Sequence, residues 1–312
     1  MIHPCLAPNI VALGGMNMAL IGTAARLPNP GETLRGERFY TAPGGKGATQ
    51  AVAAARLGAN VKMVGRVGKD VFGPTLLNAL KKDGIDVTGV AEDPDHPSGV
   101  GMIVLNAERQ NHVLAIYGAN LQCNEDQLLA VEAALNGAHI LLLQMELPFA
   151  LSVAAARSAK ARGVITMLDP APASDIPHEA FPYLDIITPN QPEAEYHTGI
   201  MVNDVPSAKA AADVLLHKGV KTAVVKMAEQ GVYWASREAS GYVPAYEVEV
   251  VDTISAGDAF SGALAVALGE GRSMEHAIRY GAAAGALAVT KRGVQTAMPF
   301  RGEVDELFNR YV

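Results

Sequence analysis

The stretch HILLLQMELPFALSVAAARSAKARGVITML, residues 139–168, decides the fold. An apolar run at 139–144 predicts a buried strand, the alanine-rich segment 150–162 predicts a helix, and the run 164–168 predicts a second strand. The alternation continues with a strand at 185–188, a helix at 205–218, a strand at 221–226, a helix that ends near 268 and another at about 273–291. This pattern predicts an α/β fold in which helices cover both faces of a mainly parallel sheet.

Upstream of this region the same pattern begins with Ile10–Leu13, a predicted strand that ends at two glycines. The alanine-rich stretch 48–57 favours a helix, and Gly58 ends it before a predicted strand at 61–64. These segments predict one further unit of the same kind.

Residues 99–117 differ, because they contain two β-prone runs joined by a polar turn at 107–110. This is the pattern of a β-hairpin. Together with the Gly- and Pro-rich segment 28–43, the hairpin predicts a small β appendage outside the main sheet.

The composition is that of a globular chain, and its net charge does not favour binding to polyanions. Of 312 residues, 49% are hydrophobic and 18% charged, and the length suits one large domain with an appendage as well as two domains. The net charge of -7 argues against nucleic acid or an anionic membrane as a partner. Cys5 and Cys123 have no metal-ligand spacing, and the chain contains neither a signal-peptide pattern nor 18 uninterrupted apolar residues. We therefore predict a cytoplasmic protein.

Several familiar catalytic motifs are missing from the sequence. Gly45 and Lys46 are followed by Gly47 rather than Ser or Thr, so there is no P-loop, and no GxGxxG, HExxH or GxSxG occurs. These absences argue against a Walker ATPase, a Rossmann dehydrogenase, a zincin and an α/β-hydrolase.

The run DTISAGD, residues 252–258, precedes a predicted helix of small residues. Ala256 and Gly257 leave the N–H groups of its first turn accessible, and with the helix dipole these donors suit an anionic phosphoryl group. Asp258 in that turn could accept a proton from an attacking hydroxyl. From the pattern alone, an aspartate that only improves a helix N-terminus is an equally good interpretation.

Polar residues follow several predicted strands at their carboxyl ends. They are Asn17, Glu146, Asp169 and Asn190. Each alone could be a turn or cap residue, but this edge of an open α/β sheet is where ligands bind. The sequence therefore predicts a ligand site there.

Two segments resemble the signature regions of the PfkB carbohydrate kinase family, and their residues are most similar to those of bacterial ribokinases. They are DTISAGD and the run GGKGATQAVAAARLGAN at 44–60. The resemblance extends over about residues 9–300 and includes PGET at 30–33, YGAN at 117–120, QMELP at 144–148, DPAPA at 169–173, TPNQPEAE at 188–195 and AVTKRGVQ at 288–295. So many segments in the family's order make the resemblance specific.

The resemblance implies a ribokinase-like three-layer α/β/α domain over residues 1–312, with a small β lid formed by about 15–44 and 98–118. It implies an ATP-dependent sugar kinase that phosphorylates a hydroxyl, expected to be a primary one, with Asp258 as its base beside Ala256 and Gly257. The sugar would be bound by Asn17, Gly45, Lys46, Thr49, Glu146 and Asp258. Related enzymes pair lid to lid, so a homodimer is expected, in keeping with the open edges of a small sheet.

The nucleotide and ion sites follow from the same resemblance. ATP would be bound by Asn190, Lys226, Met227, Ala228, Glu229, Gln230, Gly231 and Gly257, with 226–231 on its adenine and ribose side. Glu193 of the NxxE motif would hold Mg²⁺ through water. A monovalent cation such as K⁺ would be bound by Asp252, Ile254, Ala288, Lys291 and Gly293. Ribokinases usually have glycine at position 228 and often a ligating serine at position 297, where this chain has Ala228 and Ala297.

Two positions of the expected sugar pocket depart from the ribokinase pattern. Ribokinases carry an aspartate two residues after Asn17, where this chain has Ala19, and the usual asparagine of GGKGAN is Thr49. Each unmet hydroxyl of a buried substrate lowers affinity by roughly tenfold or more. The chemistry is expected to be intact, with a deoxygenated or differently substituted sugar, or a nucleoside, as an alternative to D-ribose.

Two other functions are alternatives to this one. A sugar-phosphate kinase would need cations for the second phosphate, and Arg35, Arg38 and Arg109 in the expected lid are the candidates. A non-catalytic sugar-binding relative would show erosion of DTISAGD or of the Asn190–Glu193 pair. Neither motif is eroded.

Overall fold

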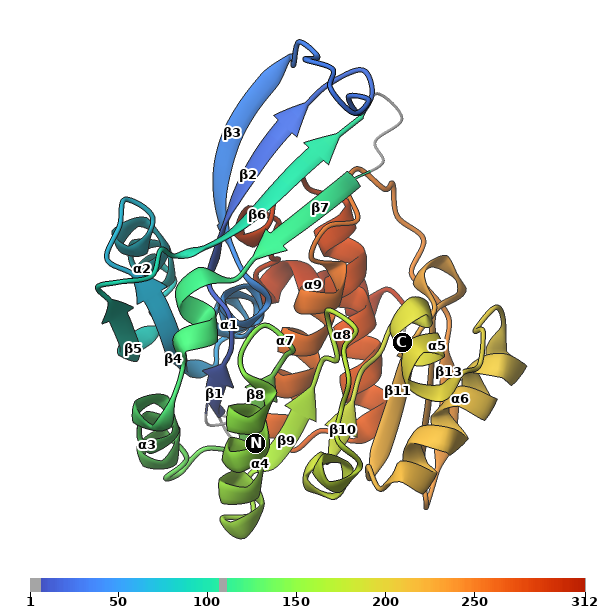
Figure 1. Cartoon of the computed structure of the whole chain (residues 1–312). Helices are drawn as coiled ribbons and strands as arrows, with labels where there is room; N and C mark the ends of the chain where they lie inside the picture. Colours follow the sequence, from blue (N-terminus) through green and yellow to red (C-terminus); the bar gives the residue numbers. More distant parts are fainter. Residues whose placement is uncertain (1–6, 107–110, 312) are drawn as a thin grey trace.

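The computed structural model describes residues 7–106 and 111–311, and most of them surround one large sheet (Figure 1). In spatial order its strands are β13 (Ser240–Val243), β12 (Val232–Ser236), β11 (Thr222–Lys226), β10 (Ile186–Ile187), β9 (Ile165–Leu168), β8 (Ile140–Leu143), β1 (Asn9–Leu13), β4 (Asn60–Gly68) and β5 (Asp86–Asp93). Neighbouring strands are parallel from β5 to β11, whereas β12 and β13 run antiparallel. The predicted, mainly parallel sheet is confirmed.

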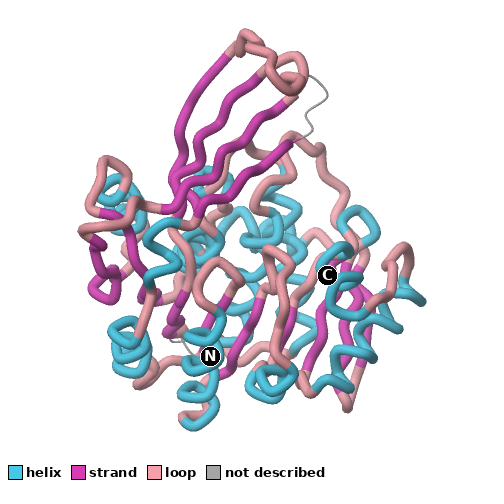
Figure 2. The backbone as a smooth tube through the Cα atoms, viewed as in Figure 1, coloured by secondary structure: helices cyan, strands magenta, loops and turns pink. Residues whose placement is uncertain are grey.

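Helices cover both faces of this sheet, as expected (Figure 2). One face is covered by α1 (Lys46–Arg56), α2 (Gly73–Lys82), α7 (Ala256–Gly269), α8 (Met274–Val289) and α9 (Arg301–Asn309). The other face is covered by α3 (Glu125–Ala134), α4 (Phe149–Ala161), α5 (Gln191–Thr198) and α6 (Val205–Lys218). Strand β1 shows the reason, because Ile10 and Ala12 belong to the first core while Val11 and Leu13 belong to the second.

The large sheet and the helices that cover it form the body of the protein. A second, smaller sheet projects from one edge of this body (Figures 1 and 2). We call this sheet the lid, and its strands in order are β3 (Arg38–Gly44), β2 (Asn17–Thr23), β6 (Gly99–Leu105) and β7 (Asn111–Ile116). Strands β6 and β7 form the predicted hairpin, since they pair antiparallel from Val100 with Ile116 to Leu105 with Asn111. The expected turn at 107–110, which includes Arg109, lies outside the described residues.

Two features of the body go beyond the sequence-based expectation. The strand predicted at 61–64 extends over Asn60–Gly68, and the antiparallel pair β12 and β13 was not predicted. Gly231 allows this reversal, because it has a φ of 83° and a Cβ there would lie 2.2 Å from the Val243 carbonyl oxygen. Short 3-10 helices span Gly118–Gln122, His178–Tyr183, Ala228–Gln230 and Gln295–Ala297.

The lid joins the body at the edge where parallel strands end. Asn17 begins β2, Glu146 follows β8, Asp169 follows β9 and Asn190 follows β10. The polar residues that were predicted to share one sheet edge therefore do so. Within residues 7–106 and 111–311, no helix combines the length and apolar character needed to cross a bilayer.

Candidate active site

Asp258 lies in the first turn of α7, at the centre of the polar residues of this edge. Ser255 precedes the helix with a φ of 63°, and the first helical hydrogen bond runs from the Ala259 N–H to the Ser255 carbonyl. The N–H groups of Ala256, Gly257 and Asp258 consequently have no partner within the helix. A non-glycine residue in this left-handed conformation is strained by about 1–2 kcal/mol, which is typical of functional turns.

The carboxylate of Asp258 is buried, with 6% of the residue exposed. Burial raises its pKa, while the Lys46 ammonium and a hydrogen bond from Gln50 act in the opposite direction. A buried carboxylate of raised pKa is a suitable proton acceptor.

A polar chain links Asp258 to the neighbouring strands. Gln50 Nε2 lies 3.1 Å from Asp258 Oδ1 and 3.1 Å from Asp169 Oδ2. Gln144 Nε2 donates to Gln50 Oε1 at 2.8 Å, and Lys226 Nζ lies 2.9 Å from Asp169 Oδ1. The chain joins α1, α7 and the ends of β8, β9 and β11 into one buried network.

Glu146 connects the lid with the GGKG loop. Asn17 Nδ2 donates to Glu146 Oε1 at 3.1 Å, and the Lys46 backbone N–H donates to Glu146 Oε2 at 2.8 Å. Burial raises the pKa of Glu146 to about 7, against the lowering effect of Lys46. Asn120 holds Asn17 from the other side, since its Nδ2 lies 2.8 Å from Asn17 Oδ1.

Glycines are required where the GGKG loop passes the end of β1. Gly45 has a φ of 89°, and a Cβ there would lie 2.5 Å from the Gly15 carbonyl oxygen. A Cβ on Gly47 would lie 2.6 Å from the Gly14 Cα. Only glycine permits this approach, which brings Lys46 to the start of α1 beside the sheet edge.

Lys46 stands among carboxylates on several elements. Burial lowers its pKa, but the charges of Asp258, Asp169, Glu146 and Glu193 raise it further, so the net direction is upward. Lys46 is therefore a permanent cation beside Asp258. Arg35 and Arg38, the described candidates for holding a second phosphate, are exposed on and beside β3.

Thr49 is placed differently from the other expected sugar residues. It is fully buried in α1, and its hydroxyl has no hydrogen-bond partner among the residues that the structure describes. It exposes no atom to a ligand in this arrangement, so a direct sugar contact by Thr49 stays a prediction.

The NxxE motif forms the N-terminus of α5. Asn190 Oδ1 accepts from the Glu193 N–H at 2.9 Å, while the Glu193 carboxylate accepts from the Asn190 N–H at 2.8 Å and from its Nδ2 at 2.9 Å. Burial raises the pKa of Glu193, and the Lys226 charge opposes this. No cluster of three His, Cys, Asp or Glu suited to a metal occurs in the described part of the chain. A hydrated Mg²⁺ fits such a site, because it needs one carboxylate besides water and phosphate oxygens.

The segment after β11 contains the expected nucleotide residues. Met227 is buried, whereas Ala228, Glu229 and Gln230 are exposed. Ala228 has a φ of 50°, so its backbone adopts the left-handed conformation that favours glycine, the residue that the resemblance leads us to expect at this position. The Lys226 side chain instead points to Asp169, away from this exposed turn.

The expected monovalent-cation residues come from two segments that lie together. The N–H groups of Val251 and Asp252 both donate to the Val289 carbonyl oxygen, which places 251–254 beside the end of α8. The Lys291 N–H donates to the Ala288 carbonyl oxygen, while its ammonium pairs with Glu303 Oε1 at 2.6 Å. Gly293 follows with a φ of 105°. A cation bound here stays a prediction.

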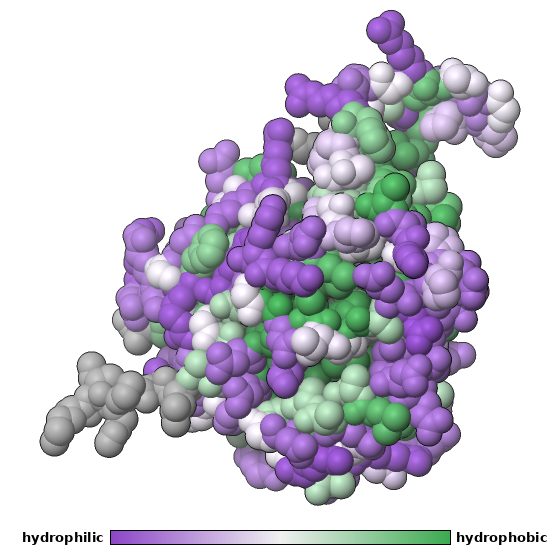
Figure 3. All heavy atoms as spheres, turned by 90° about the vertical axis from the view of Figure 1, so that its left-hand side faces the viewer, coloured by the Kyte–Doolittle hydropathy of each residue, from purple (hydrophilic) through white to green (hydrophobic). Residues whose placement is uncertain are grey.

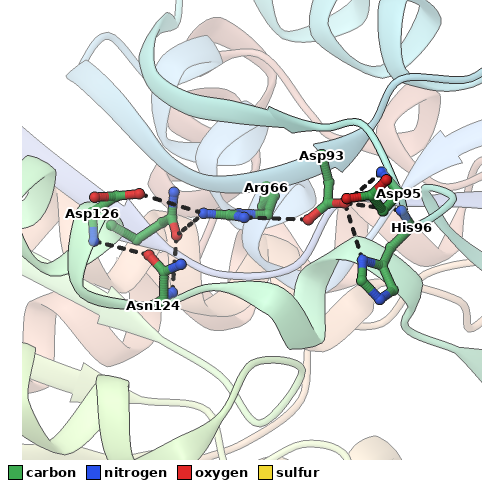
Figure 4. A network of polar contacts seen from close by, with 7 residues as sticks. Arg66, Asp93, Asp95, His96, Asn124 and Asp126 are labelled. Atoms are coloured by element: carbon green, nitrogen blue, oxygen red, sulfur yellow. Dashed lines mark hydrogen bonds and ion pairs between the residues drawn. The ribbon is translucent and has the colours of Figure 1, made fainter.

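An arginine network supports the segment that enters the lid (Figure 4). Arg66 of β4 contacts Asp93 Oδ2 at 3.2 Å and Gln127 Oε1 at 3.1 Å. Asp93 Oδ1 accepts from the N–H groups of Asp95 and His96. These contacts hold the turn before β6 against β4 and α3.

Sequence reasoning did not select Gln50, Gln144 or Asn120 as site residues, and it placed Asp169 at the predicted ligand-binding edge without giving it a role. All four lie inside the quoted motif segments, at GGKGATQ, QMELP, YGAN and DPAPA. Their position within those motif segments was the one sign in the sequence that they could belong to the site. Their roles follow only from contacts between distant parts of the chain.

A model of the family described as pfkB family carbohydrate kinase matches residues 7–301. The chain belongs to this family. Haemophilus influenzae ribokinase is 38% identical over 297 residues, which cover 95% of this chain and 97% of that protein. The deoxyribokinase of Salmonella typhi is 35% identical over 304 residues, or 97% of this chain and 98% of that protein.

The fold of this pfkB carbohydrate kinase also matches solved structures. Arabidopsis thaliana ribokinase, complexed with ribose and ATP, has a TM-score of 0.89 and 32% identity, covering 97% of this chain and 99% of that one. Thermotoga maritima ribokinase has a TM-score of 0.87 and 34% identity, covering 97% of this chain and all of that one. The protein is a sugar kinase with a ribokinase-like fold, and it phosphorylates its sugar with ATP.

Proposed function

We propose that this kinase phosphorylates a deoxy sugar or a similarly less hydroxylated small sugar in preference to D-ribose, with Asp258 as the base. The observation that carries the proposal is the wall beside Asn17. Ala19 lies on the same face of β2 as Asn17, because side chains two residues apart share a face. Only 6% of Ala19 is exposed, and it has no oxygen to offer a sugar hydroxyl.

The neighbouring strands extend this apolar wall. Ala19 pairs with Ala42 of β3 and with Gly101 of β6, and Gly101 pairs with Ala115 of β7. Residues that pair directly share a face, so a row of small side chains crosses the lid at this level. A substrate with fewer hydroxyls on this side leaves fewer polar groups without a partner. The deoxyribokinase among the relatives accords with this choice.

The proposed chemistry uses the polar groups around Asp258. The acceptor hydroxyl oxygen attacks the γ-phosphorus, the bond between that phosphorus and the bridging oxygen of ADP breaks, and the hydroxyl proton passes to Asp258. The free amides of Ala256, Gly257 and Asp258 would stabilise charge on the phosphoryl group. Asn17, Gly45, Lys46 and Glu146 would hold the sugar.

ATP would lie between the start of α7 and the exposed turn at 228–230. Asn190 and Lys226 to Gly231 would line its site, and Glu193 would hold Mg²⁺ through water. The ion would neutralise charge on the phosphates. A monovalent cation would bind near Asp252, Ile254, Ala288, Lys291 and Gly293, close to the anion hole.

We further propose that the whole chain is one cytoplasmic kinase domain that forms a homodimer through the lid. The lid face opposite Asn17 and Ala19 exposes Phe39 by 70%, Met102 by 48%, Leu114 by 60% and Ile116 by 46%. Apolar residues are visible among hydrophilic ones on the lid, at the top of Figure 3. An exposed apolar sheet face with two open edges suits a second copy of the same lid.

A substrate panel tests the proposed specificity. The panel contains ribose, 2-deoxyribose, fructose, 2-keto-3-deoxygluconate and nucleosides, and ADP release is followed in a coupled assay. We expect the highest kcat/KM with a deoxy sugar. If ribose gave the highest kcat/KM, the proposed specificity would be wrong.

A further inference from the structure

Gln50 is a fully buried glutamine whose side-chain amide lies between two carboxylates. Its Nε2 contacts Asp169 Oδ2 and Asp258 Oδ1, each at 3.1 Å. A side-chain amide nitrogen has two hydrogens, and both are used by these bonds. Gln50 is thus joined directly to the proposed catalytic base.

Gln144 determines which end of the Gln50 amide faces the carboxylates. Its Nε2 donates to Gln50 Oε1 at 2.8 Å. A flipped amide would turn Gln50 Oε1 toward two carboxylates and its NH₂ group toward another NH₂ group, leaving all three contacts unfavourable. Gly14 leaves space for this arrangement, because a Cβ there would lie 1.9 Å from Gln144 Oε1.

Building on the proposed function, we propose that Gln50 is a positioning residue for Asp258. It holds the carboxylate through Oδ1 and leaves Oδ2 as the oxygen that accepts the proton of the sugar hydroxyl. A carboxylate without this bond could rotate about its last torsion, and a misplaced base loses much of its catalytic effect.

The charged groups around Asp258 explain why an uncharged hydrogen-bond donor such as the Gln50 amide suits this position. The charged groups that face it are Lys46 on α1, Asp169 after β9, Lys226 at the end of β11 and Glu146 after β8. The part of α8 beside the start of α7, from Gly281 to Val289, contains no ionisable residue. Gln50 therefore separates two carboxylates without adding a charge of its own, and its bond opposes the rise in the pKa of Asp258 that burial causes.

The alternative is that Gln50 only fills space between α1 and the sheet. Methionine has a similar length and no hydrogen-bond donor, so Gln50→Met separates the two roles. Loss of filling alone would change stability or lower activity equally at every pH. Loss of the hydrogen bond would raise the pKa of Asp258, so that the base is protonated at higher pH.

The test measures kcat against pH for the full-length Gln50→Met variant with the best sugar of the panel. We expect the acid limb of kcat to move upward by about one pH unit, with the KM for ATP unchanged within about twofold. Calorimetric binding of ATP gives a readout that does not depend on turnover. Gln127→Met, which changes a buried glutamine in the Arg66 network, is the matched control and should leave the acid limb in place.

An acid limb that does not move, or an equal loss of kcat at every pH, would overturn the positioning role. If Gln50→Met does not fold, Gln144→Met gives the answer, because it releases the Gln50 amide and should shift the limb in the same direction by less. Substitution of Asp258 by Asn separates this inference from the proposed function. Full activity of that variant would overturn the role of Asp258 itself, whereas an inactive Asp258→Asn with an unshifted Gln50→Met would overturn only the inference about Gln50.

Discussion

The ammonium of Lys226 lies 2.9 Å from Oδ1 of Asp169, and both side chains are almost enclosed. The same ammonium is close to Gly257, where a Cβ would lie 3.2 Å from it. Lys226 therefore places a positive charge at the first turn of α7. The ion pair also neutralises the charge of Asp169. Of the two carboxylates that Gln50 joins, Asp169 and Asp258, only Asp169 is therefore bonded to a lysine among the described residues.

Replacing Asp258 by Asn should lower kcat by about 10²- to 10⁴-fold, because the variant has no general base at this position. ATP binding should remain nearly unchanged, since the amides at the start of α7 are retained. Coupled ADP release and calorimetry measure the two effects. Asp213→Asn, on the exposed face of α6, is the control and should behave as the unmodified enzyme does.

Replacing Ala19 by Asp should shift specificity toward ribose by about tenfold or more in the ratio of kcat/KM values for ribose and 2-deoxyribose. The neighbouring Gly101 leaves room, since nothing lies within 4 Å of a Cβ built there. Ala19→Leu fills the same space without oxygens and should not favour ribose. An unchanged ratio in Ala19→Asp would show that this wall does not contact the sugar.

The raised pKa of Glu146 should make the stability of the folded protein depend on pH. Burial raises its pKa to about 7 in the folded protein, above its ordinary value of 4.5. Its contribution is therefore fully present below pH 4.5 and is lost as the pH rises through 7. Relative to Glu146→Gln, the free energy of unfolding should fall between pH 5 and pH 8 by on the order of 2 kcal/mol. Urea unfolding at the two pH values measures it, and equal pH slopes for both proteins would contradict the assignment.

Replacing Ala228 by Gly should stabilise the protein by about 0.5–1 kcal/mol. The residue has a φ of 50°, a conformation that costs alanine more than glycine. Ala130→Gly within α3 is the control, and it should destabilise by a similar amount because its conformation is helical. Thermal unfolding measures the melting temperatures of both variants. A melting temperature of Ala228→Gly below that of the unmodified protein would contradict backbone strain at Ala228.

Replacing Leu114 by Asp should yield a monomer, because a charge would be buried in the proposed contact between two lids. Light scattering at micromolar concentration measures the mass. Val71→Asp changes a residue that is 80% exposed outside the lid, and it should leave the dimer intact. A monomeric mass for the unmodified protein would rule out the dimer directly.

The fold class and the centre of the site could be predicted from local signals. Alternating apolar runs and alanine-rich helices specify the parallel sheet, and DTISAGD marks the start of α7 with Asp258 in it. The antiparallel strands β12 and β13 could not be predicted in the same way, because their position depends on Gly231 and on pairing across the sheet edge. The pairing of Lys226 with Asp169 spans 57 residues and needed the fold.

Thr49 and Gln50 show the same limit within a single motif. Adjacent residues of α1 face different surroundings. Only the packed structure shows that the Thr49 hydroxyl has no partner within the described parts of the chain, while Gln50 reaches two carboxylates. Motif membership indicates importance, whereas the direction of a side chain depends on what packs against the helix.

The lid is connected to the body through residues that belong to the site itself. Asn17 begins β2, Lys46 follows β3 and Asn120 follows β7, and all three meet at or beside Glu146. Any swing of the lid must therefore move the groups that are proposed to grip the acceptor. We expect lid closure and sugar capture to be a single event, which would keep water from taking the phosphoryl group and so limit wasteful hydrolysis of ATP when no sugar is bound.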